Sequence, residues 1–236
     1  MGITSVEDII RIEIDDKANR FKTEDDVIVE YKLKLCVNEN NYDTILCSPK
    51  HLDNLVIGRL ASDGIINTRE DISSINIDEN QGIASIMLNS VKKPGIKKKI
   101  ESDLSVKPDN ILGLMRSLDD MSTTFKKTGG VHGCALCDNE KIIAFDFDLG
   151  RHNAIDKIVG YAILNKIDLA KKIIVASCRI SSEIMLKIAQ IGIPFISSRS
   201  APTQLAIKIA RESGITLIGF AREQRMNIYS IPERVL

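Results

Sequence analysis

The chain contains no tryptophan, and its aromatic residues together make up only 4% of 236 residues. An aromatic platform that stacks the bases of single-stranded nucleic acid is therefore not expected. The formal net charge is zero, because 32 lysines and arginines balance 32 aspartates and glutamates. No global electric field draws the protein to nucleic acid or to an anionic membrane, so any anion-binding site must be local.

Long hydrophobic runs are absent too. No stretch approaches the roughly 18 apolar residues of a membrane-spanning helix, and the N-terminal MGITSVEDII lacks the basic and apolar regions of a signal peptide. The five cysteines are an odd number without the spacing of a disulfide framework, which is typical of free thiols in a reducing compartment. We therefore expect a cytoplasmic protein without contact to membranes.

The first part of the chain has the two-residue period of β-strands. Apolar and mostly polar residues alternate over residues 27–37, and Ile10, Ile12 and Ile14 repeat the pattern upstream. Each segment is expected to be a half-buried strand with one face in the core, in a mostly antiparallel region. Two further strands are expected at 42–47 and 83–88.

One helix should interrupt these strands. Ser48 has the side chain of an N-cap, Pro49 suits the first helical turn, and Gly64 would end the helix. The lysine-rich segment KKPGIKKKIESD, residues 92–103, is expected to be mobile and to mark a domain boundary. It separates a β-rich part, residues 1–103, from the rest of the chain.

Residues 104–236 alternate helices with short apolar runs. Asp109 is the expected N-cap of one helix, and two later helices are expected from about Ser181 and Ala201. Short buried strands that alternate with helices favour a parallel sheet covered on both faces, so we predict a three-layer α/β domain. Its expected strands are 173–177, 193–197 and 215–220.

An arginine follows each of these three strands: Arg179, Arg199 and Arg222. Because ligands of open α/β sheets bind beyond the carboxyl ends of the strands, we expect these arginines to share one edge and to hold an anionic, phosphorylated ligand there. The alternative is that each arginine only caps a loop in solvent. Ser200, in the motif SRSAPT, adds a hydroxyl at the same edge.

Residues 128–157 hold two of the three histidines and two of the five cysteines. The turn at Gly129 and Gly130 lets the backbone approach a ligand closely, although such turns are equally often plain connectors. A group of polar residues then begins a helix, more than capping needs. These residues are Arg151, His152, Asn153, Asp156 and Lys157.

Cys134 and Cys137 form a C-x-x-C motif beside His132. This spacing suits a dithiol, half of a zinc site or a thiolate nucleophile, and each needs deprotonated sulfur. His132 would favour the thiolate if it were charged. The alternative is that VHGCALC is a buried strand in which both cysteines fill the core, as expected for Cys36 and Cys47. A zinc site that also includes His132 and His152 is conceivable, but no second C-x-x-C supports it.

Several ordered motifs resemble the formate dehydrogenase accessory proteins of the FdhD/NarQ family. They are TGGVHGCALCD, LGRHNAIDKIVGYA, the segment from RISSEIM to LIGFAR, the closing NIYSIPERV and, in the N-terminal half, the stretch from LCVNENNYD to ASDGII. The resemblance covers nearly the whole chain. It implies a cytidine-deaminase-like α/β/α domain preceded by a smaller β-rich part, and commonly a homodimer.

The resemblance also implies a sulfurtransferase. Such a protein takes persulfide sulfur from a cysteine desulfurase and delivers it to the molybdenum (or tungsten) bis-guanine-dinucleotide cofactor of formate dehydrogenase, which it binds as a client. No resident metal is implied. SRSAPT and GRHN would line the cofactor cavity, and a further segment would contact the cofactor. That segment consists of Phe220, Ala221, Arg222, Glu223, Gln224 and Arg225.

One departure from the family concerns the sulfur carrier. The usual C-G-x-C-G motif lies upstream of TGG, whereas the matching residues 91–105 contain lysines and no cysteine. Either Cys134 or Cys137 carries the persulfide, or the protein binds the cofactor as a chaperone without transferring sulfur. Cys178, which replaces the glycine of the usual S-G-R-I-S, is a further thiol candidate. A zinc hydrolase is disfavoured because the H-x-E and P-C-x-x-C pattern of the deaminases is absent.

Overall fold

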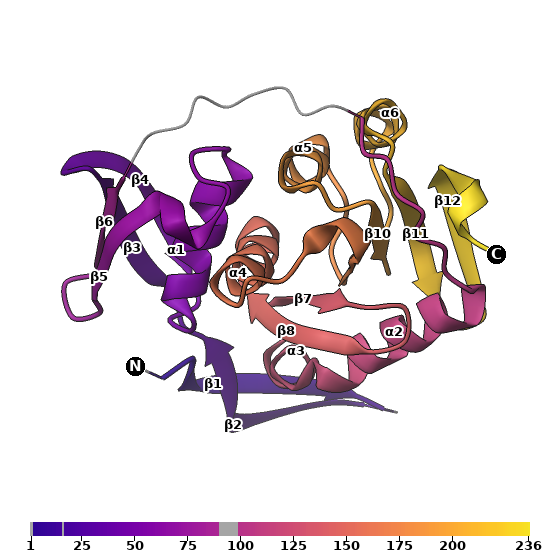
Figure 1. Ribbon diagram of the computed structural model, residues 1–236. Coiled ribbons are helices and arrows are strands. Elements are labelled where there is room, and N and C mark those ends of the chain that lie inside the picture. Colours follow the sequence, from indigo (N-terminus) through magenta and orange to yellow (C-terminus); the bar gives the residue numbers. More distant parts are fainter. Residues whose placement is uncertain (1, 16, 90–98) are drawn as a thin grey trace.

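The computed structural model describes residues 2–15, 17–89 and 99–236, which form three sheets and the helices around them (Figure 1). The first sheet is an antiparallel pair, β1 (Thr4–Ile14) and β2 (Ala18–Ile28). None of the described helices is long and apolar enough to cross a membrane. The expected mobile segment 92–103 falls outside the described residues up to position 98, so the proposed boundary at residue 103 stays a prediction.

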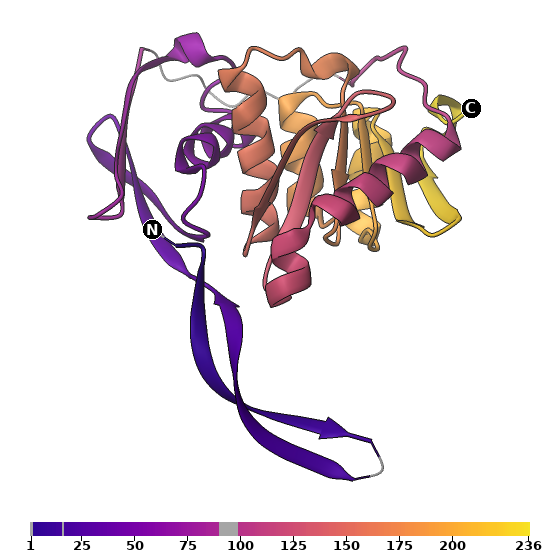
Figure 2. The same ribbon diagram turned by 90° about the horizontal axis from the view of Figure 1, so that it is seen from below.

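The β1–β2 pair is an arm that projects from the body of the protein (Figure 2). The alternation at Ile10, Ile12 and Ile14 correctly predicts a strand, but the expectation of a core face is wrong, because these side chains are 51%, 58% and 79% exposed. The expected strand 27–37 is also two strands, since β2 ends at Ile28 and the next strand starts in another sheet. Alternation therefore identified the strands here but not what covers them.

The second sheet has four strands in the order β4-β3-β6-β5. All neighbouring pairs are antiparallel except β3 and β6, which confirms the mostly antiparallel expectation. Alternate residues of β3, among them Leu33 and Leu35, are fully buried in the core that this sheet forms with helix α1. The elements are β3 (Tyr31–Val37), β4 (Asn40–Cys47), α1 (Leu52–Ser62), η1 (Arg69–Asp71), β5 (Ile72–Asp78) and β6 (Ile83–Leu88).

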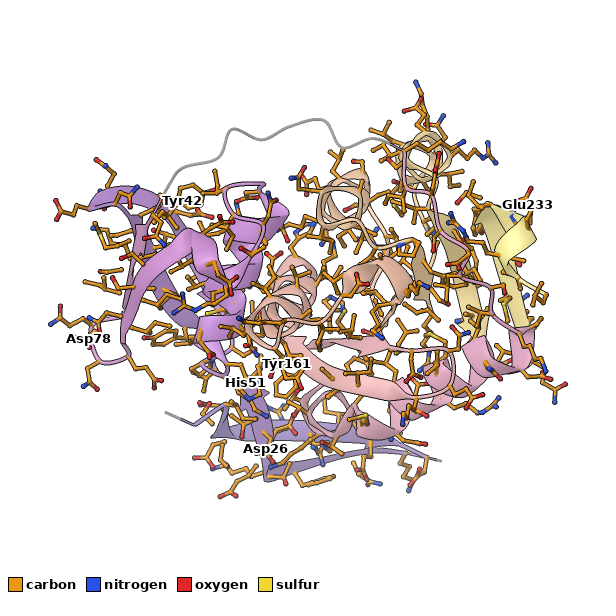
Figure 3. All side chains as sticks on the ribbon, in the orientation of Figure 1. Asp26, Tyr42, His51, Asp78, Tyr161 and Glu233 are labelled. Carbon is orange, nitrogen blue, oxygen red and sulfur yellow. The ribbon has the colours of Figure 1, made fainter. Side chains whose placement is uncertain are left out.

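Helix α1 begins later than Ser48, which is not its N-cap. The backbone N–H of Ser48 donates to Asp148 and its hydroxyl accepts from the N–H of Leu149, so this serine joins the two halves of the chain instead. His51 is the residue before the helix, with φ 50° in the left-handed region. Its Nδ1 lies 2.7 Å from the buried carboxylate of Asp146 in the third sheet, and this contact ties the start of α1 to that sheet. Figure 3 labels His51 at this position.

The third sheet has six strands in the order β12-β11-β10-β9-β7-β8. β9, β10 and β11 are parallel, as their alternation with helices predicts, whereas β7, β8 and β12 are antiparallel additions. The strands are β7 (His132–Cys137), β8 (Ile142–Asp148), β9 (Ile173–Ala176), β10 (Phe195–Ser198), β11 (Thr216–Arg222) and β12 (Arg225–Ser230). The remaining short elements are η2 (Leu169–Lys171) and η3 (Pro232–Arg234).

Helices cover both faces of this sheet, which confirms the three-layer α/β prediction. α2 packs on one face; α4, α5 and α6 pack on the other, where α1 joins their core. α2 starts at Pro108 rather than after Asp109, and α6 starts three residues beyond Ala201. The helices are α2 (Pro108–Met121), α3 (Thr123–Thr128), α4 (Arg151–Leu164), α5 (Ser182–Ile191) and α6 (Gln204–Ser213).

Two glycines allow α1 and α4 to cross at very short range. A Cβ on Gly58 would collide with the backbone oxygen of Asp156, and one on Gly160 would collide with that of Asn54. Backbone contact of this kind needs glycine on both helices. The hydrophobic core is consequently continuous from the four-stranded sheet to the six-stranded sheet.

Candidate functional site

The carboxyl ends of the parallel strands β9, β10 and β11 meet at one edge of the six-stranded sheet. β7 runs in the opposite direction, so its first residue, His132, lies at the same edge. A cavity of about 440 Å³ opens there, within the size range of small-molecule sites. We call it the edge cavity; its lining residues are Asp119, Ser122, Phe125, His132, Gly133, Ser177, Arg199, Ser200, Phe220 and Arg222.

Half of this lining was expected from sequence. Arg199, Ser200 and Arg222 follow strands, and Phe220 and His132 come from the motifs singled out above. The other half was missed, and most of it comes from the end of α2 and from α3. No periodicity in the sequence indicates that these helices end beside the strand termini, so nothing in the sequence pointed to Asp119 or Phe125 as members of the cavity.

An ion pair lies in the wall of the edge cavity. Nη1 of Arg199 lies 2.8 Å from each carboxylate oxygen of Asp119, and both side chains are nearly half exposed. The prediction of an anion site assumed that Arg199 is a free cation, but Arg199 is paired with Asp119. Arg222 is placed differently, because its guanidinium lies 5.9 Å from the centre of the Phe220 ring. The guanidinium donates to none of the residues that the structure describes, so its donors are available to a ligand.

Phe220 lines the edge cavity with a strained backbone conformation. Its φ is 53°, in the left-handed region that a bulky side chain rarely adopts, and its N–H donates to the carbonyl of Ser200. A side chain on neighbouring Gly219 would press on Pro202 and on the same carbonyl. The SRSAPT loop therefore packs directly on β11, and strain of this kind clusters at functional sites.

The rest of the FAREQR segment does not line the edge cavity. Ala221 is fully buried in the core beneath α2, so its side chain faces away from a ligand. Glu223 and Gln224 form the exposed turn between β11 and β12, and Glu223 is also in the left-handed region. Arg225 begins β12 and is exposed. Contact of these residues with a cofactor stays a prediction.

His132 is a neutral imidazole in this setting. Burial lowers its pKa, and the nearby charges of Arg151 and Arg179 lower it further. Neither arginine lines the edge cavity, so the expectation that Arg179 and Arg151 line the ligand site is not supported by this arrangement. A neutral His132 can accept or donate hydrogen bonds, but it is not a cation that would favour a neighbouring thiolate.

The two cysteines of the C-x-x-C motif lie on opposite faces of the sheet. Cys134 packs in the core with α4, and Cys137 packs in the core with α2. Residues three apart on a strand point in opposite directions, so the pair is neither a dithiol nor half of a zinc site. Among the described residues there is also no group of three or more histidine, cysteine or acidic side chains that could hold a metal.

Burial also keeps these thiols protonated. It raises the pKa of Cys137 to about 12, that of Cys178 to about 11, and that of Cys134 well above its usual range. Cys178 directly follows Ser177, which lines the edge cavity, but only 3% of its own surface is exposed. Of the two cysteines expected in the core, Cys47 is buried but Cys36 is only partly covered.

The residues of the GRHN motif do not lie together at one site. Asn153 donates to the backbone of Leu46 and to Asp148, which also lies 2.7 Å from Nζ of the fully buried Lys157. This network joins the two halves of the chain, and a buried ion pair of this kind requires its hydrogen-bond partners. Asn153 is thus part of a structural network, and its contact with a cofactor stays a prediction.

His152 belongs to a second cavity, of about 450 Å³, between α1 and α5. Its Nε2 lies 3.3 Å from Glu183, and burial, followed by the charge of Arg151, lowers its pKa. The expected place of His152 at the cofactor is therefore not supported by this arrangement.

The glycine turn serves packing. Gly129 ends α3 with φ 64°, and Gly130 packs so tightly that a Cβ would lie 2.9 Å from the side chain of Ile28 in β2. Neither glycine lines the edge cavity.

Another cavity, of about 470 Å³, lies away from the strand ends, between η1 and the ends of α4 and α5. Its Lys166 already pairs with Glu70 at 2.7 Å. Its described lining contains no aromatic ring, whereas the edge cavity has two, and we therefore regard the edge cavity as the better candidate site.

Comparison with known proteins gives consistent results. The model of the FdhD/NarQ family matches residues 28–99 and 87–236. The chain is 37% identical over 259 residues to the sulfur carrier protein FdhD of Bacillus subtilis, covering 99% of this chain and 98% of the relative. It is 40% identical over 240 residues to the protein of the same name from Listeria innocua, covering 90% and 92%.

A solved structure has the same fold. The crystal structure of a protein described as a formate dehydrogenase accessory protein, from Desulfotalea psychrophila, matches with a TM-score of 0.89 and 28% identity. The match covers 100% of both chains.

Proposed function

The chain belongs to the FdhD/NarQ family, and from this premise we propose that it serves formate dehydrogenase maturation by binding a molybdenum (or tungsten) bis-guanine-dinucleotide cofactor. The edge cavity would hold the guanine nucleotide end of this client. The observation that carries the proposal is the combination, in one cavity, of two aromatic rings, an Arg–Asp pair and further polar donors.

The aromatic rings suit a nucleobase. Phe125 and Phe220 both line the cavity, and a purine gains stacking energy against such rings in a way that does not depend on the base. The choice among bases must then come from polar groups at the base edge.

The Arg199–Asp119 pair supplies those polar groups. The Watson–Crick edge of guanine presents an acceptor, O6, beside two donors, the N1–H and the 2-amino group. A carboxylate can accept from both donors while an adjacent guanidinium donates to O6. Adenine presents a donor where guanine has O6 and an acceptor in place of N1–H, so the same ion pair would oppose it. Asp119 would thus read the two donors of guanine, and Arg199 would both position Asp119 and donate to O6.

The phosphates would bind at the other polar groups. Arg222 is free to donate to an ionised group, and the hydroxyls of Ser177 and Ser200 lie at the ends of neighbouring strands. Neutral His132 can donate one further hydrogen bond. Each hydrogen bond to a charged group contributes about 1.5–3 kcal/mol before the cost of association, so this set suffices for binding.

Titration calorimetry with simple nucleotides tests the proposal without the loaded cofactor. We expect GDP to bind the full chain, GMP to bind more weakly because it lacks the second phosphate, and ADP to bind at least about tenfold more weakly than GDP. Equal affinity for ADP and GDP would contradict base reading by the ion pair. Absence of binding to all three would contradict the proposed function.

Sulfur transfer is a second candidate function, favoured by the name sulfur carrier protein that the relatives bear. In such a step a cysteine thiolate attacks the outer sulfur of the persulfide on a cysteine desulfurase, forms a new S–S bond and releases the desulfurase thiolate. Cys134 and Cys178 directly follow Gly133 and Ser177, which line the edge cavity, but both thiols are buried and protonated. The chaperone role therefore fits the present geometry better.

Peptide mass spectrometry separates the two functions. After incubation with a cysteine desulfurase and cysteine, a carrier would gain a labile sulfur on one cysteine, and the Cys134→Ser, Cys137→Ser or Cys178→Ser variant would lose it. We expect no such addition on these three residues while GDP still binds. An addition that disappears in one variant would establish the carrier function.

A further inference from the structure

A further cavity, of about 380 Å³, lies between the start of α1, the strand β8 and the second half of α4. We call it the α1–α4 cavity. It shares no lining residue with the edge cavity, and α4 packs on the opposite face of the six-stranded sheet from α2. Its volume is within the range of small-molecule sites. A ligand held there would therefore be separate from a ligand in the edge cavity.

His51 provides a hydrogen-bond acceptor at the α1–α4 cavity, which it lines. Its Nδ1 lies 2.7 Å from the carboxylate of Asp146, which is only 4% exposed. An ionised carboxylate accepts but does not donate, so in the neutral imidazole the proton is on Nδ1 and Nε2 keeps its lone pair. Nε2 has no hydrogen-bond partner among the described residues. The buried Asp146 thus fixes the imidazole and leaves it one free acceptor.

Capping of α1 does not explain the position of His51. The residue before a helix is most often serine, threonine, aspartate or asparagine, whose side chain accepts from the first turn. The side chain of His51 makes no such bond, and its φ of 50° lies in the strained left-handed region. Strain of this kind persists only where the surroundings hold a residue in place. The side chain of His51 therefore serves its contact with Asp146 rather than the helix end.

Three further polar side chains of the α1–α4 cavity lack partners. The carboxylate of Asp53, the amide of Asn54 and the hydroxyl of Tyr161 make no hydrogen bond or ion pair with any residue that the structure describes. Figure 3 labels Tyr161 on α4 together with His51 at the start of α1. With Nε2 of His51, one cavity thus has four polar groups that the described fold does not use.

The charges at the α1–α4 cavity favour a cation. Asp53 and Asp146 supply two carboxylates, whereas none of the described lining residues is a lysine or an arginine. The free N–H groups at the start of α1 are equivalent to about half a positive charge, which the two carboxylates outweigh. The nearby Lys50 does not line the cavity, and its Nζ lies 5.2 Å from the centre of the Phe147 ring. The sum stays negative even when His51 is charged.

We propose that the α1–α4 cavity binds a small organic cation, which is an ammonium or guanidinium group on a short apolar stem. Asp53 and Nε2 of His51 would accept hydrogen bonds from the cationic group, and the ring of Tyr161 would add a cation–π interaction. Ile158 and Leu164 line the same cavity and offer apolar contacts to the stem. A metal ion suits the cavity less well, because the described chain has no group of three or more histidine, cysteine or acidic side chains that could hold one.

Amide NMR titration of the full chain with three probes of equal stem length tests the proposal. The probes are n-butylammonium, n-butylguanidinium and n-butanol. We expect both cations to bind with dissociation constants of about 1 mM and to shift the amide signals of residues 51–54 and of Tyr161. n-Butanol, which has the same stem without the charge, should bind at least about tenfold more weakly. Absence of binding by both cations, or equal binding of n-butanol, would overturn the proposal.

Matched substitutions locate the binding site. Asp53→Asn should weaken cation binding at least about tenfold, because it removes the unpaired carboxylate. Asp109→Asn is the control and should bind as the wild type does, since Asp109 is also an exposed acid in the first turn of a helix but lies outside the cavity. Tyr161→Leu should weaken binding, whereas Tyr161→Phe keeps the ring and should retain it. Thermal unfolding checks that each variant is folded. Equal affinities of the two aspartate variants would contradict the cation site.

The cation can come from a free amine or from a basic side chain of another protein. Acetyl-Gly-Lys-Gly-amide and acetyl-Gly-Arg-Gly-amide present the same cationic groups on a peptide backbone. Binding of either peptide at least as tightly as the butyl probes would assign the cavity to a protein side chain. Exclusive binding of the butyl cations would assign it to a small amine or guanidine. Both outcomes require Asp53, so peptide binding that Asp53→Asn leaves unchanged would also overturn the proposal.

Discussion

The two edges of the six-stranded sheet use arginine in opposite ways. At the amino edge, Arg234 is buried, and its guanidinium donates to the carbonyls of Pro194 and Gly214, which precede β10 and β11. At the carboxyl edge of these strands, Arg199 and Arg222 line a cavity. At the amino edge the arginine therefore hydrogen-bonds to the backbone and holds the strands together. At the carboxyl edge the two arginines instead line a cavity that can hold a ligand.

The difference teaches that the residue type alone does not identify a site. Burial lowers the pKa of Arg234, and its carbonyl partners are fixed parts of the fold. At the other edge Phe220 adopts a strained backbone, and a half-exposed carboxylate, Asp119, holds Arg199. Partial exposure beside a cavity therefore marks the functional edge, and burial with satisfied donors marks the structural one. Backbone strain does not separate them, because Ile231, three residues before Arg234, also has a positive φ of 46°.

The largest effect should come from the amino edge. Arg234→Ala leaves buried carbonyls without donors, so we expect a loss of about 2–4 kcal/mol in the free energy of unfolding. Urea unfolding measures this loss. Arg211→Ala is the matched control, because Arg211 also donates to a carbonyl but is exposed, and it should cost less than about 0.5 kcal/mol. Equal losses in the two variants would remove the distinction between the edges.

At the carboxyl edge, loss of an arginine should weaken ligand binding and leave stability nearly unchanged. Arg222→Ala should lower GDP affinity by about tenfold or more, through the loss of a charged hydrogen bond. It should change the unfolding free energy by less than about 0.5 kcal/mol, because the side chain faces the cavity. Calorimetry and urea unfolding on the same preparation measure both. Unchanged GDP affinity in this variant would contradict a phosphate-binding role for Arg222.

His132 at the carboxyl edge should also make the stability of the folded protein depend on pH. The pKa of His132 is lowered in the folded protein, so the unfolded chain binds more protons as the pH falls below about 6.5, and stability decreases there. His132→Gln should reduce this decrease between about pH 7 and pH 5, as measured by thermal unfolding. His152→Gln should do the same independently, since the pKa of His152 is lowered as well. An unchanged slope in both variants would contradict the assigned shifts.

The smallest effect concerns thiol reactivity. Buried, protonated thiols react slowly with alkylating reagents, so Cys36, which is only partly covered, should be labelled first by iodoacetamide at pH 7.5. Cys134, Cys137 and Cys178 should react only on unfolding. Peptide mapping after short exposures measures the order. Rapid labelling of Cys134 or Cys178 would indicate that a thiol opens to the edge cavity, and it would strengthen the sulfur carrier reading.

Much of the fold could be predicted because local periodicity reflects burial. The alternation of short strands with helices after residue 104 correctly predicts a covered parallel sheet. The same reasoning is wrong for Ile10, Ile12 and Ile14, because an alternating strand looks identical whether its apolar face meets a core or solvent. Ser48 failed as a cap for a related reason: its donor and acceptor groups are used by residues about one hundred positions away.

The candidate site was partly predictable from the order of strands in the sequence. Arg199 and Arg222 follow strands, and strand ends converge in any parallel sheet. Asp119 could not be found this way, because its contact with Arg199 spans eighty residues and joins a helix end to a strand end. The C-x-x-C motif was misleading because a strand sends Cys134 and Cys137 to opposite faces, which spacing alone does not reveal.

The central claim is that the edge cavity reads a guanine base through Asp119. Calorimetric titration of the Asp119→Asn variant with GDP and XDP tests it most directly, because asparagine offers one acceptor and one donor, which complement the N1–H and the O2 of xanthine. We predict that the wild type prefers GDP and that the variant prefers XDP, with the ratio of affinities changing by at least about tenfold. Retention of the wild-type preference for GDP in the variant would contradict the account.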